Sequence, residues 1–589
     1  MTSSIGDYAA IGDGRTVALV GRDGSVDWLC LPDLDSPSMF GAILDPERGG
    51  GFRLAPEIPY ETERRYLPST NVLETVFRTR DGAIRVVDAL TLTGSGVAPL
   101  RELVRSVEGL SGDVPMAWEV EPRFGYGGPT RLGWRAGIPV ATSRASAVAL
   151  CSWDAGSPGV GDGCIRGRRV IEQGQRATLV LSIAEQEPLV FSPRRVSEGR
   201  LDATVAFWRR WSDLRRYDGA RRGAVVRSAL ALKLLIFSPS GALAAAPTTS
   251  LPEDIGGERN WDYRFCWVRD AAFTLTALLG LGCLDEAEAF FWWLMQASQL
   301  THPRLQVLYR LDGGASARER TLPFSGYRGS RPVRIGNGAV DQLQLDVYGD
   351  LFDTVSRYAD HGALDREVAH RLAQTANLVC EEWRRPDAGL WEVRSEPEHF
   401  TQSKMMCWVA LDRALHLAAA GQIPARDAPR WRREAHEIRE FVDRRCWSDT
   451  RQSYLRSADS GGVDASLLIG VLFGYLSPDD PRSTATIDAV RRDLADGALV
   501  YRYRGEDGLA GGEGAFLACS FWLVESLARV GHVDEASELM DELMGYANDV
   551  GLYSEEFEPT TGELVGNFPQ ALTHLALINA ALALGRSSA

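Results

Sequence analysis

The spacing of apolar residues changes once along this 589-residue chain, near residue 202. Before that point, short β-branched or apolar runs, such as residues 16–21 and 84–90, are separated by turn sequences such as Arg80-Asp81-Gly82. Short strands punctuated in this way are typical of an antiparallel β-sandwich. After that point, apolar residues recur at helical spacing for most of the chain. We therefore predict a β-sandwich over residues 1–200 and an all-α part after it.

The second part is long enough to form a closed ring of helices. Residues 201–222 are predicted to form a linker helix, and residues 223–589 a helical domain. The pattern predicts eleven helices, at residues 224–237, 271–281, 285–299, 344–361, 365–384, 402–420, 429–445, 483–495, 513–529, 533–546 and 570–584. Paired helices can close into a ring that buries both layers. Eleven is close to the twelve that an (α/α)6 barrel needs, and the absence of a fixed sequence repeat argues against a solenoid.

Charge and composition limit the partners of the chain. The net charge is −15 and the pI is about 5.2, without a basic tract. Nucleic-acid binding needs a basic footprint, so we exclude this class and expect a small neutral ligand. The eight histidines include no HExxH pattern, which argues against a catalytic zinc ion. Homo-oligomerisation is possible, but the sequence does not define the oligomeric state.

Cysteine use and the N-terminal sequence indicate the cellular compartment. Nine cysteines are widely spaced without a CxxC pair, which favours reduced thiols over disulfides or a zinc site. The first residues have no basic region followed by an apolar run, and no stretch of about 18 apolar residues exists. We therefore predict a cytoplasmic enzyme with no membrane partner.

Two short acidic motifs far apart in the chain are candidates for catalysis. They are Leu390-Trp391-Glu392 and Ser554-Glu555-Glu556, and each follows turn residues, including Gly389 and Gly551. Two carboxylates brought together from distant loops are the minimal equipment for cleaving a glycosidic bond. Because the chain has 79 acidic residues, the pair alone is weak evidence.

A third segment, residues 260–270, is dense in aromatic and charged side chains. It contains Trp261, Asp262, Tyr263, Arg264, Phe265, Trp267, Arg269 and Asp270. Sugars bind through flat aromatic surfaces and a few well-placed polar groups. In the alternative interpretation, Asp270 caps a helix and the tryptophans belong to the core.

The three segments together resemble the family 15 glycoside hydrolases, the group of glucoamylases, glucodextranases and trehalases. Trp267-Val268-Arg269-Asp270, Leu390-Trp391-Glu392 and Ser554-Glu555-Glu556 occur in that family's order and approximate spacing. The resemblance covers nearly the whole chain. It implies a β-sandwich followed by an (α/α)6 barrel, and hydrolysis with inversion and without a cofactor or metal.

Site residues are carried over by position from this resemblance. Glu392 resembles the general acid and Glu555 the general base, with Glu556 as the rival base. Arg269 and Asp270 match the pair that holds the non-reducing glucose, and Tyr263 matches the aromatic residue beneath it. Trp391 and Trp267 are expected to line the same subsite.

The resemblance predicts an inverting, exo-acting α-glucoside hydrolase that releases β-glucose from short maltose- or isomaltose-type oligosaccharides. The alternative is an α,α-trehalase, since the bacterial branch includes trehalases with similar motifs. A non-catalytic sugar-binding protein and a phosphorylase on the same scaffold are weaker alternatives, because both motif positions hold glutamate. The sequence does not separate trehalose from other linkages.

Some remaining polar residues are predicted to be structural. The segment from Tyr501 to Gly508 and the glycine-rich segment around Glu513 are interpreted as barrel loops, with Glu513 at a helix N-terminus or near substrate. His416 and His574 are expected to be satisfied core or surface residues. His399, seven residues after Glu392, could also reach a pocket.

Overall fold

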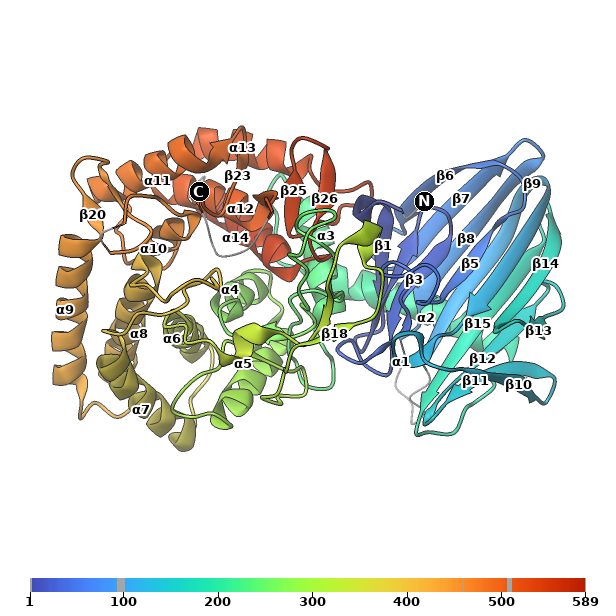
Figure 1. Ribbon diagram of the computed structural model, residues 1–589, viewed down its shortest axis with the longest axis horizontal. Coiled ribbons are helices and arrows are strands. Elements are labelled where there is room, and N and C mark those ends of the chain that lie inside the picture. Colours follow the sequence, from blue (N-terminus) through green and yellow to red (C-terminus); the bar gives the residue numbers. More distant parts are fainter. Residues whose placement is uncertain (1–2, 93–100, 459, 506–510, 588–589) are drawn as a thin grey trace.

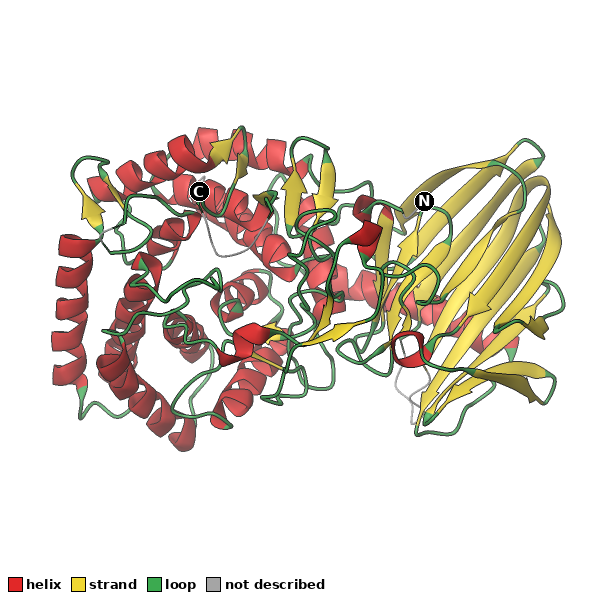
Figure 2. Ribbon diagram, viewed as in Figure 1, coloured by secondary structure: helices red, strands yellow, loops and turns green. Residues whose placement is uncertain are grey.

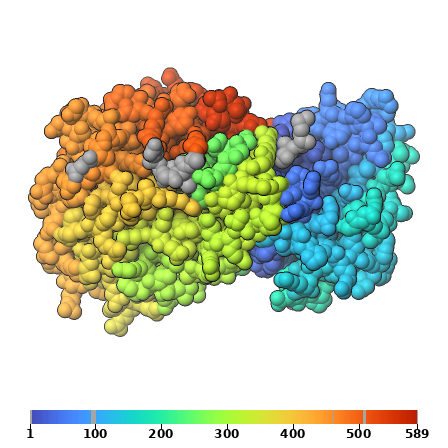
Figure 3. Space-filling view, viewed as in Figure 1, coloured from blue at the N-terminus to red at the C-terminus, as the bar shows by residue number. Residues whose placement is uncertain are grey.

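The chain folds into a β-sheet part and a helical part that lie side by side (Figures 1 and 3). The computed structural model describes residues 3–92, 101–458, 460–505 and 511–587. Residues 506–508 of the loop predicted from Tyr501 to Gly508 lie outside the described residues. Among the described residues, no helix combines the length and the hydrophobicity needed to cross a membrane.

Within the described residues, fifteen antiparallel strands form the N-terminal part, which the sequence predicts to be an antiparallel β-sandwich (Figure 2). The strands are β1 (Tyr8–Gly12), β2 (Val17–Gly21), β3 (Ser25–Cys30), β4 (Ser38–Phe40), β5 (Gly51–Pro56), β6 (Tyr60–Tyr66), β7 (Leu73–Thr79), β8 (Gly82–Leu90), β9 (Arg101–Glu121), β10 (Arg131–Arg135), β11 (Ile138–Ser143), β12 (Ser146–Trp153), β13 (Gly159–Gly161), β14 (Cys164–Glu172) and β15 (Arg176–Glu185).

The long strand β9 joins two sheets. Its first half pairs with β15 and β8, and its second half pairs with β14 and β5. Apolar side chains of both sheets belong to one buried core. The helix that follows the sheets, α2 (Arg194–Asp213), begins seven residues before the predicted linker of 201–222 and ends nine residues before the end of that range. Pro193 precedes its first residue, and a proline is tolerated at that end because no helical hydrogen bond is lost there.

Twelve helices build the barrel within the part of the chain that the structure describes. The outer six are α3 (Arg222–Leu235), α5 (Leu284–Gln299), α7 (Arg366–Glu382), α9 (Ala428–Arg445), α11 (Pro481–Leu494) and α13 (Val533–Met544). The inner six are α4 (Ala271–Gly280), α6 (Val347–Ala359), α8 (Thr401–Ala419), α10 (Ile469–Leu472), α12 (Leu517–Arg529) and α14 (Ala571–Ser587). Consecutive inner helices pack against each other, and α14 returns to α4, so the ring closes (Figure 1).

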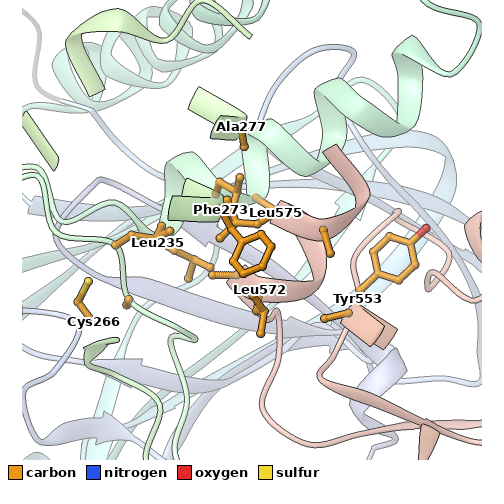
Figure 4. Packing of buried hydrophobic residues seen from close by; sticks show 14 of the residues in the cluster. Leu235, Cys266, Phe273, Ala277, Tyr553, Leu572 and Leu575 are labelled. Carbon is orange, nitrogen blue, oxygen red and sulfur yellow. The ribbon is translucent and has the colours of Figure 1, made fainter. Parts of the chain in front are cut away.

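The position of α12 in the inner ring explains why it is buried on all sides. Every residue of α12 from Leu517 to Ala528 is buried, which is the pattern of a helix enclosed by neighbours. At the seam, Phe273 and Ala277 of α4 pack with Leu572 and Leu575 of α14 (Figure 4). The prediction of a β-sandwich followed by an (α/α)6 barrel is confirmed.

Two local features of the barrel differ from the prediction. The helix α10 and the 3-10 turn before it, Ala465–Leu468, were not predicted, because eight residues are too few for a periodic signal. The predicted helix at 513–529 begins only at Leu517, after the short strand β24 (Ala515–Phe516). Glu513 therefore lies in a loop and not in the first turn of a helix.

The sheets pack against the barrel through buried polar contacts as well as a shared core. The Trp28 indole N–H of β3 donates to the Pro247 carbonyl at 2.8 Å. The Asn548 side chain donates to the Tyr8 carbonyl at 2.8 Å. The Arg64 guanidinium on β6 pairs with Asp549 at 2.6 Å, and its side chain is only 1% exposed. Truncating one partner of such a pair leaves a buried charge unpaired.

The connections that run from an outer helix to the next inner helix carry the polar, aromatic-rich segments. The α3–α4 connection contains Tyr263 and Arg269, α7–α8 contains Glu392, α11–α12 contains Arg502, and α13–α14 contains Glu555. Because every such connection leads into the N-terminus of an inner helix, these side chains gather at one end of the barrel.

Candidate active site

A cavity of about 230 Å³ lies where these connections meet. It is lined by Glu253, Arg259, Trp261, Tyr263, Arg269, Glu319, Asn337, Gly338, Ala339, Gln342, Trp391, Glu392, Val393, Arg394, Arg502, Tyr503, Phe516 and Glu555. Both carboxylates singled out in the sequence, Glu392 and Glu555, are on this wall. So are the predicted binding residues Tyr263, Arg269 and Trp391.

Glu392 is held by neighbours on both its backbone and its carboxylate. The indole N–H of Trp267 donates to its Oε1 at 2.6 Å, and the Arg269 guanidinium lies 3.4 Å from the same atom. Its backbone has φ of 59°, in the left-handed region that side chains rarely adopt, at a cost of roughly 1–3 kcal/mol. Gln342 donates to its carbonyl at 3.3 Å, and Arg269 donates to the Leu390 carbonyl at 2.8 Å. These contacts fix the strained loop and aim the carboxylate at the cavity.

Glu555, in the second acidic motif, is held by a hydrogen bond from the segment at 260–270. The Tyr263 hydroxyl donates to its Oε1 at 2.7 Å. Gly566, with φ of +79°, leaves the space that the Glu555 side chain occupies, since a Cβ there would approach the Glu555 Cβ to 2.7 Å. The rings of Tyr263 and Trp267, which hold the two carboxylates, are 5.3 Å apart in an edge-to-face arrangement. The segment at 260–270 thus joins the two acidic motifs.

Glu556 is turned away from the cavity into a cluster of charges. Its Oε2 accepts the backbone N–H of Gly514 at 2.9 Å, and its Oε1 lies 3.3 Å from the Arg502 guanidinium. Arg502 also donates to Glu253 at 2.9 Å and to Glu513 at 2.8 Å. We call Glu253, Glu513, Glu556 and Arg502 the four-residue charge cluster. In it, one buried cation faces three carboxylates.

The charge cluster also contains carboxylates close enough together for a cation. Among the described residues, oxygens of Glu253, Glu513 and Glu556 lie within 4.8 Å of one another. The Arg502 guanidinium bonds to the same groups and already supplies positive charge there. The arrangement is therefore that of a buried ion network.

Burial raises the pKa of both Glu392 and Glu555. For Glu392, burial is the largest cause, and the Arg269 charge and the Trp267 hydrogen bond act in the opposite direction. For Glu555, burial and then the carboxylate of Glu253 raise the pKa to about 8, against Arg502 and the Tyr263 hydrogen bond. Carboxyl groups with raised pKa values in a cavity are typical of acid–base sites.

The aromatic wall beside Glu392 is fixed in orientation. The Trp391 indole N–H donates to both oxygens of buried Asp464, at 2.8 and 2.9 Å. Trp391 also stacks on Trp522 of α12, with ring centroids 6.1 Å apart. Asp464 comes from the α9–α10 connection, whose described residues do not line the cavity.

Three of the predicted site residues lie behind the cavity wall. Trp267 is 1% exposed and contacts Glu392, Asp270 is buried and accepts a hydrogen bond from Arg269 at 3.1 Å, and Glu556 belongs to the charge cluster. They support the wall and do not form part of it. Asp270 occupies the position before α4, but its side chain does not cap the helix.

The histidines lie away from the cavity. His574 is buried on α14, with its ring 3.0 Å from the Ser228 hydroxyl, and His416 is exposed on α8. His399 packs against Phe441 of α9, with ring centroids 5.6 Å apart, and is not on the cavity wall.

Several wall residues carried no signal in the sequence analysis. Arg502 lies in a segment that the sequence predicts only as a loop, and Glu253 follows a proline without any motif. Both are wall residues because non-local folding brings the α11–α12 and α3–α4 connections together. Only burial would have distinguished Arg502 from other arginines in loops, and burial cannot be derived from a loop sequence.

A buried pair of carboxylates in an (α/α)6 barrel defines a glycoside-hydrolase type of site, and comparisons with known proteins specify it. The family model described as "Glycosyl hydrolases family 15" matches residues 219–540 and 530–582, and a model described as "Trehalase-like, N-terminal" matches residues 2–152. The chain belongs to glycoside hydrolase family 15 and is a glycoside hydrolase.

Curated relatives match along almost the whole chain. A trehalase of Mycolicibacterium smegmatis is 40% identical over 616 residues, covering 98% of this chain and 90% of the relative. A trehalase of Thermoplasma volcanium is 35% identical, covering 98% of this chain and 92% of the relative. Among solved structures, a bacterial glucoamylase complexed with acarbose matches with a TM-score of 0.73 at 14% identity, covering 100% of this chain and 94% of that one. At that identity, the structural match supports the fold alone.

Proposed function

We propose that this protein is an α,α-trehalase that hydrolyses trehalose with inversion. The observation that carries this proposal is that Glu392 and Glu555 share one cavity of about 230 Å³. Relatives named trehalase, 40% and 35% identical, support the same substrate.

In the proposed mechanism, the two carboxylates act on opposite sides of the scissile bond. Glu392, in its protonated form, gives its proton to the glycosidic oxygen. Glu555, in its ionised form, takes a proton from the water that attacks the anomeric carbon. Arg269 and Tyr263, both on the wall, contact the glucose that reacts. No cofactor is needed for this chemistry.

The contacts of the two neighbouring glutamates favour Glu555 as the base over Glu556. Glu555 lies on the cavity wall and is oriented by the Tyr263 hydroxyl. Glu556 is fully buried and is held by Arg502 and the Gly514 N–H. A base must come within hydrogen-bond reach of the water that it activates, and the contacts of Glu556 keep it from doing so.

Product analysis tests both the substrate and the stereochemistry. Purified protein is incubated separately with trehalose, maltose and isomaltose, and proton NMR follows the first products. We expect cleavage of trehalose to give equal amounts of β-glucose, from the inverted centre, and α-glucose, the leaving sugar. Two α-glucose molecules would contradict inversion. Preferential cleavage of maltose or isomaltose would contradict the trehalase proposal. It would support the prediction of a hydrolase for maltose- or isomaltose-type oligosaccharides.

A further inference from the structure

The mouth of the cavity contains a second set of charges that the proposed mechanism does not use. The guanidinium groups of Arg334 and Arg394 both lie over the Trp261 ring, 4.5 and 4.3 Å from its centroid. Glu319 lies 3.3 Å from Arg334 and 3.4 Å from Arg394. A guanidinium over an indole ring is held by cation–π attraction. Arg394 and Glu319 therefore offer hydrogen-bond donors beside acceptors in a braced arrangement.

The surroundings of this set give it fixed anchors. Arg334 is mostly buried and donates to the carbonyls of Glu258, at 2.7 Å, and Asn260, at 3.0 Å. The Glu319 carboxylate accepts the Gly338 N–H at 3.2 Å. The side chains of Glu319 and Arg394 remain 27% and 39% exposed, so they are within reach of a ligand at the mouth.

The set adjoins the proposed acid and not the proposed base. Arg394 follows Glu392 by two residues, and Gln342 on the same wall donates to the carbonyls of Glu392 and Val393 at 3.3 and 3.4 Å. The base side is instead formed by Tyr263 and the charge cluster. Because the acid protonates the oxygen of the leaving group, a leaving sugar must lie on the acid side.

We propose that Arg394 and Glu319, braced by Trp261, bind the hydroxyl groups of the leaving glucose and determine the choice of leaving sugar. This inference rests on the proposed function for the identity of that sugar. A planar arginine donates to two hydroxyls at once, and a carboxylate accepts from two. The alternative is a surface ion pair that contacts no ligand, and such pairs contribute little.

The test compares two substrates that differ only in the leaving group. Trehalose needs a site for the leaving glucose, whereas α-glucosyl fluoride loses only fluoride. In Arg394→Gln and Glu319→Gln, we expect kcat/KM for trehalose to fall about 10- to 100-fold, the range of lost substrate contacts. We expect kcat/KM for the fluoride to fall by less than about threefold. Trp261→Phe is expected to give an intermediate loss on trehalose.

A matched control comes from another guanidinium–indole pair, far from the cavity. Arg482 lies 5.7 Å from the centroid of the Trp447 ring. Trp447→Phe should leave kcat/KM unchanged for both substrates. Equal losses on both substrates would overturn the inference, since the set would then act on the reacting glucose or on folding. Unchanged trehalose hydrolysis in Arg394→Gln and Glu319→Gln would also overturn it.

Failure of the proposed function gives a different result. If the wild type cleaves maltose and not trehalose, the trehalase proposal fails. The comparison of the disaccharide that is cleaved with α-glucosyl fluoride still tests Arg394 and Glu319.

Discussion

The two candidate catalytic carboxylates, Glu392 and Glu555, belong to the same residue type but have different surroundings. Glu392 is bonded by a neutral indole N–H and lies 3.4 Å from the Arg269 guanidinium. Glu555 is bonded by the Tyr263 hydroxyl and lies beside Glu253, a member of the charge cluster. Burial raises the pKa of both groups. The difference lies in the neighbouring charges: Glu253 raises the pKa of Glu555 further, whereas Asp270 is the carboxylate that acts on Glu392.

The charges beside Glu392 and Glu555 affect how readily each carboxyl group ionises. A cation favours the ionised form of a nearby carboxyl group, and a second carboxylate disfavours it. Near Glu555, Arg502 and Arg269 oppose Glu253, so the ionisation of the proposed base depends on the balance within the charge cluster. Near Glu392, the same two arginines oppose Asp270 instead. Perturbing each side should therefore produce different kinds of change.

The largest effects should come from removing each carboxylate in turn. We expect Glu392→Gln and Glu555→Gln to lower kcat on trehalose by about 10²- to 10⁴-fold, the scale of general acid–base catalysis. With α-glucosyl fluoride, whose leaving group needs no proton, Glu392→Gln should recover much of its activity and Glu555→Gln should not. Steady-state kinetics on both substrates measure the difference.

The control for these variants is Glu396→Gln, in an exposed position four residues after Glu392. It should retain wild-type rates. If Glu555→Gln recovered on the fluoride as well as Glu392→Gln does, the assignment of two separate roles would be wrong. Near-normal turnover in Glu555→Gln together with lost turnover in Glu556→Gln would assign the role of general base to Glu556.

The second effect tests the charge cluster as a structural unit. Arg502→Met leaves Glu253, Glu513 and Glu556 without their shared cation. Removing one partner of a buried ion pair costs about 3–5 kcal/mol, so we expect a lowered thermal midpoint together with lost activity. Differential scanning calorimetry measures the change against Arg504→Met, an exposed arginine two residues along the chain.

A double variant makes this result specific. Arg502→Met combined with Glu253→Gln should be less destabilised than the sum of the two single variants, because both partners of one contact are then removed. Additive losses would mean that the 2.9 Å contact between Arg502 and Glu253 does not stabilise the loop.

The third effect compares the two rings that orient the carboxylates. Trp267→Phe removes the N–H that bonds Glu392, and Tyr263→Phe removes the O–H that bonds Glu555. Each keeps most of the ring and should lower kcat about tenfold, the consequence of a loosened catalytic group. Only Trp267→Phe should be rescued by α-glucosyl fluoride. Rescue of Tyr263→Phe would show that Tyr263 acts on the acid side.

The helices were predictable from the sequence because their signal is local. The predicted helix at 365–384 corresponds to α7 (Arg366–Glu382), and 533–546 to α13 (Val533–Met544), since apolar residues repeat at helical spacing. The α10 helix, Ile469–Leu472, has only four residues and shows no period. Glu513 was placed in a helix because the apolar pattern of α12 extends back toward it, whereas the pairing of β24 with β25 keeps that segment extended.

The site was only partly predictable, for a different reason. Motifs identified Glu392 and Glu555, but a motif does not say which side chains face the cavity. Trp267 and Asp270 lie one layer behind it because the chain turns into α4 at that point. Arg502 and Glu253 are 249 positions apart, and their contact depends on barrel closure. Contacts of that kind cannot be predicted from a local sequence pattern.

The smallest effect concerns pH and tests the comparison most directly. Glu253→Gln removes the carboxylate that raises the pKa of Glu555, while Arg502, Arg269 and Tyr263 still lower it. The pKa of Glu555 should therefore fall from about 8. Because the base must be ionised to act, activity is lost as pH falls through this pKa. With α-glucosyl fluoride, whose departure needs no acid, the acidic limb of the kcat/KM profile should move to lower pH by roughly 0.5–1 unit.

Measuring the profile with α-glucosyl fluoride isolates the base, since the acid is not needed for fluoride departure. A shift of the acidic limb on this substrate would place Glu253 beside Glu555 in the functioning enzyme. An unchanged acidic limb on this substrate would mean that Glu253 does not act on Glu555, and the proposed influence of the neighbouring charge would fail. Glu396→Gln, which removes an exposed charge near Glu392 in sequence, should move neither limb, because solvent screens it.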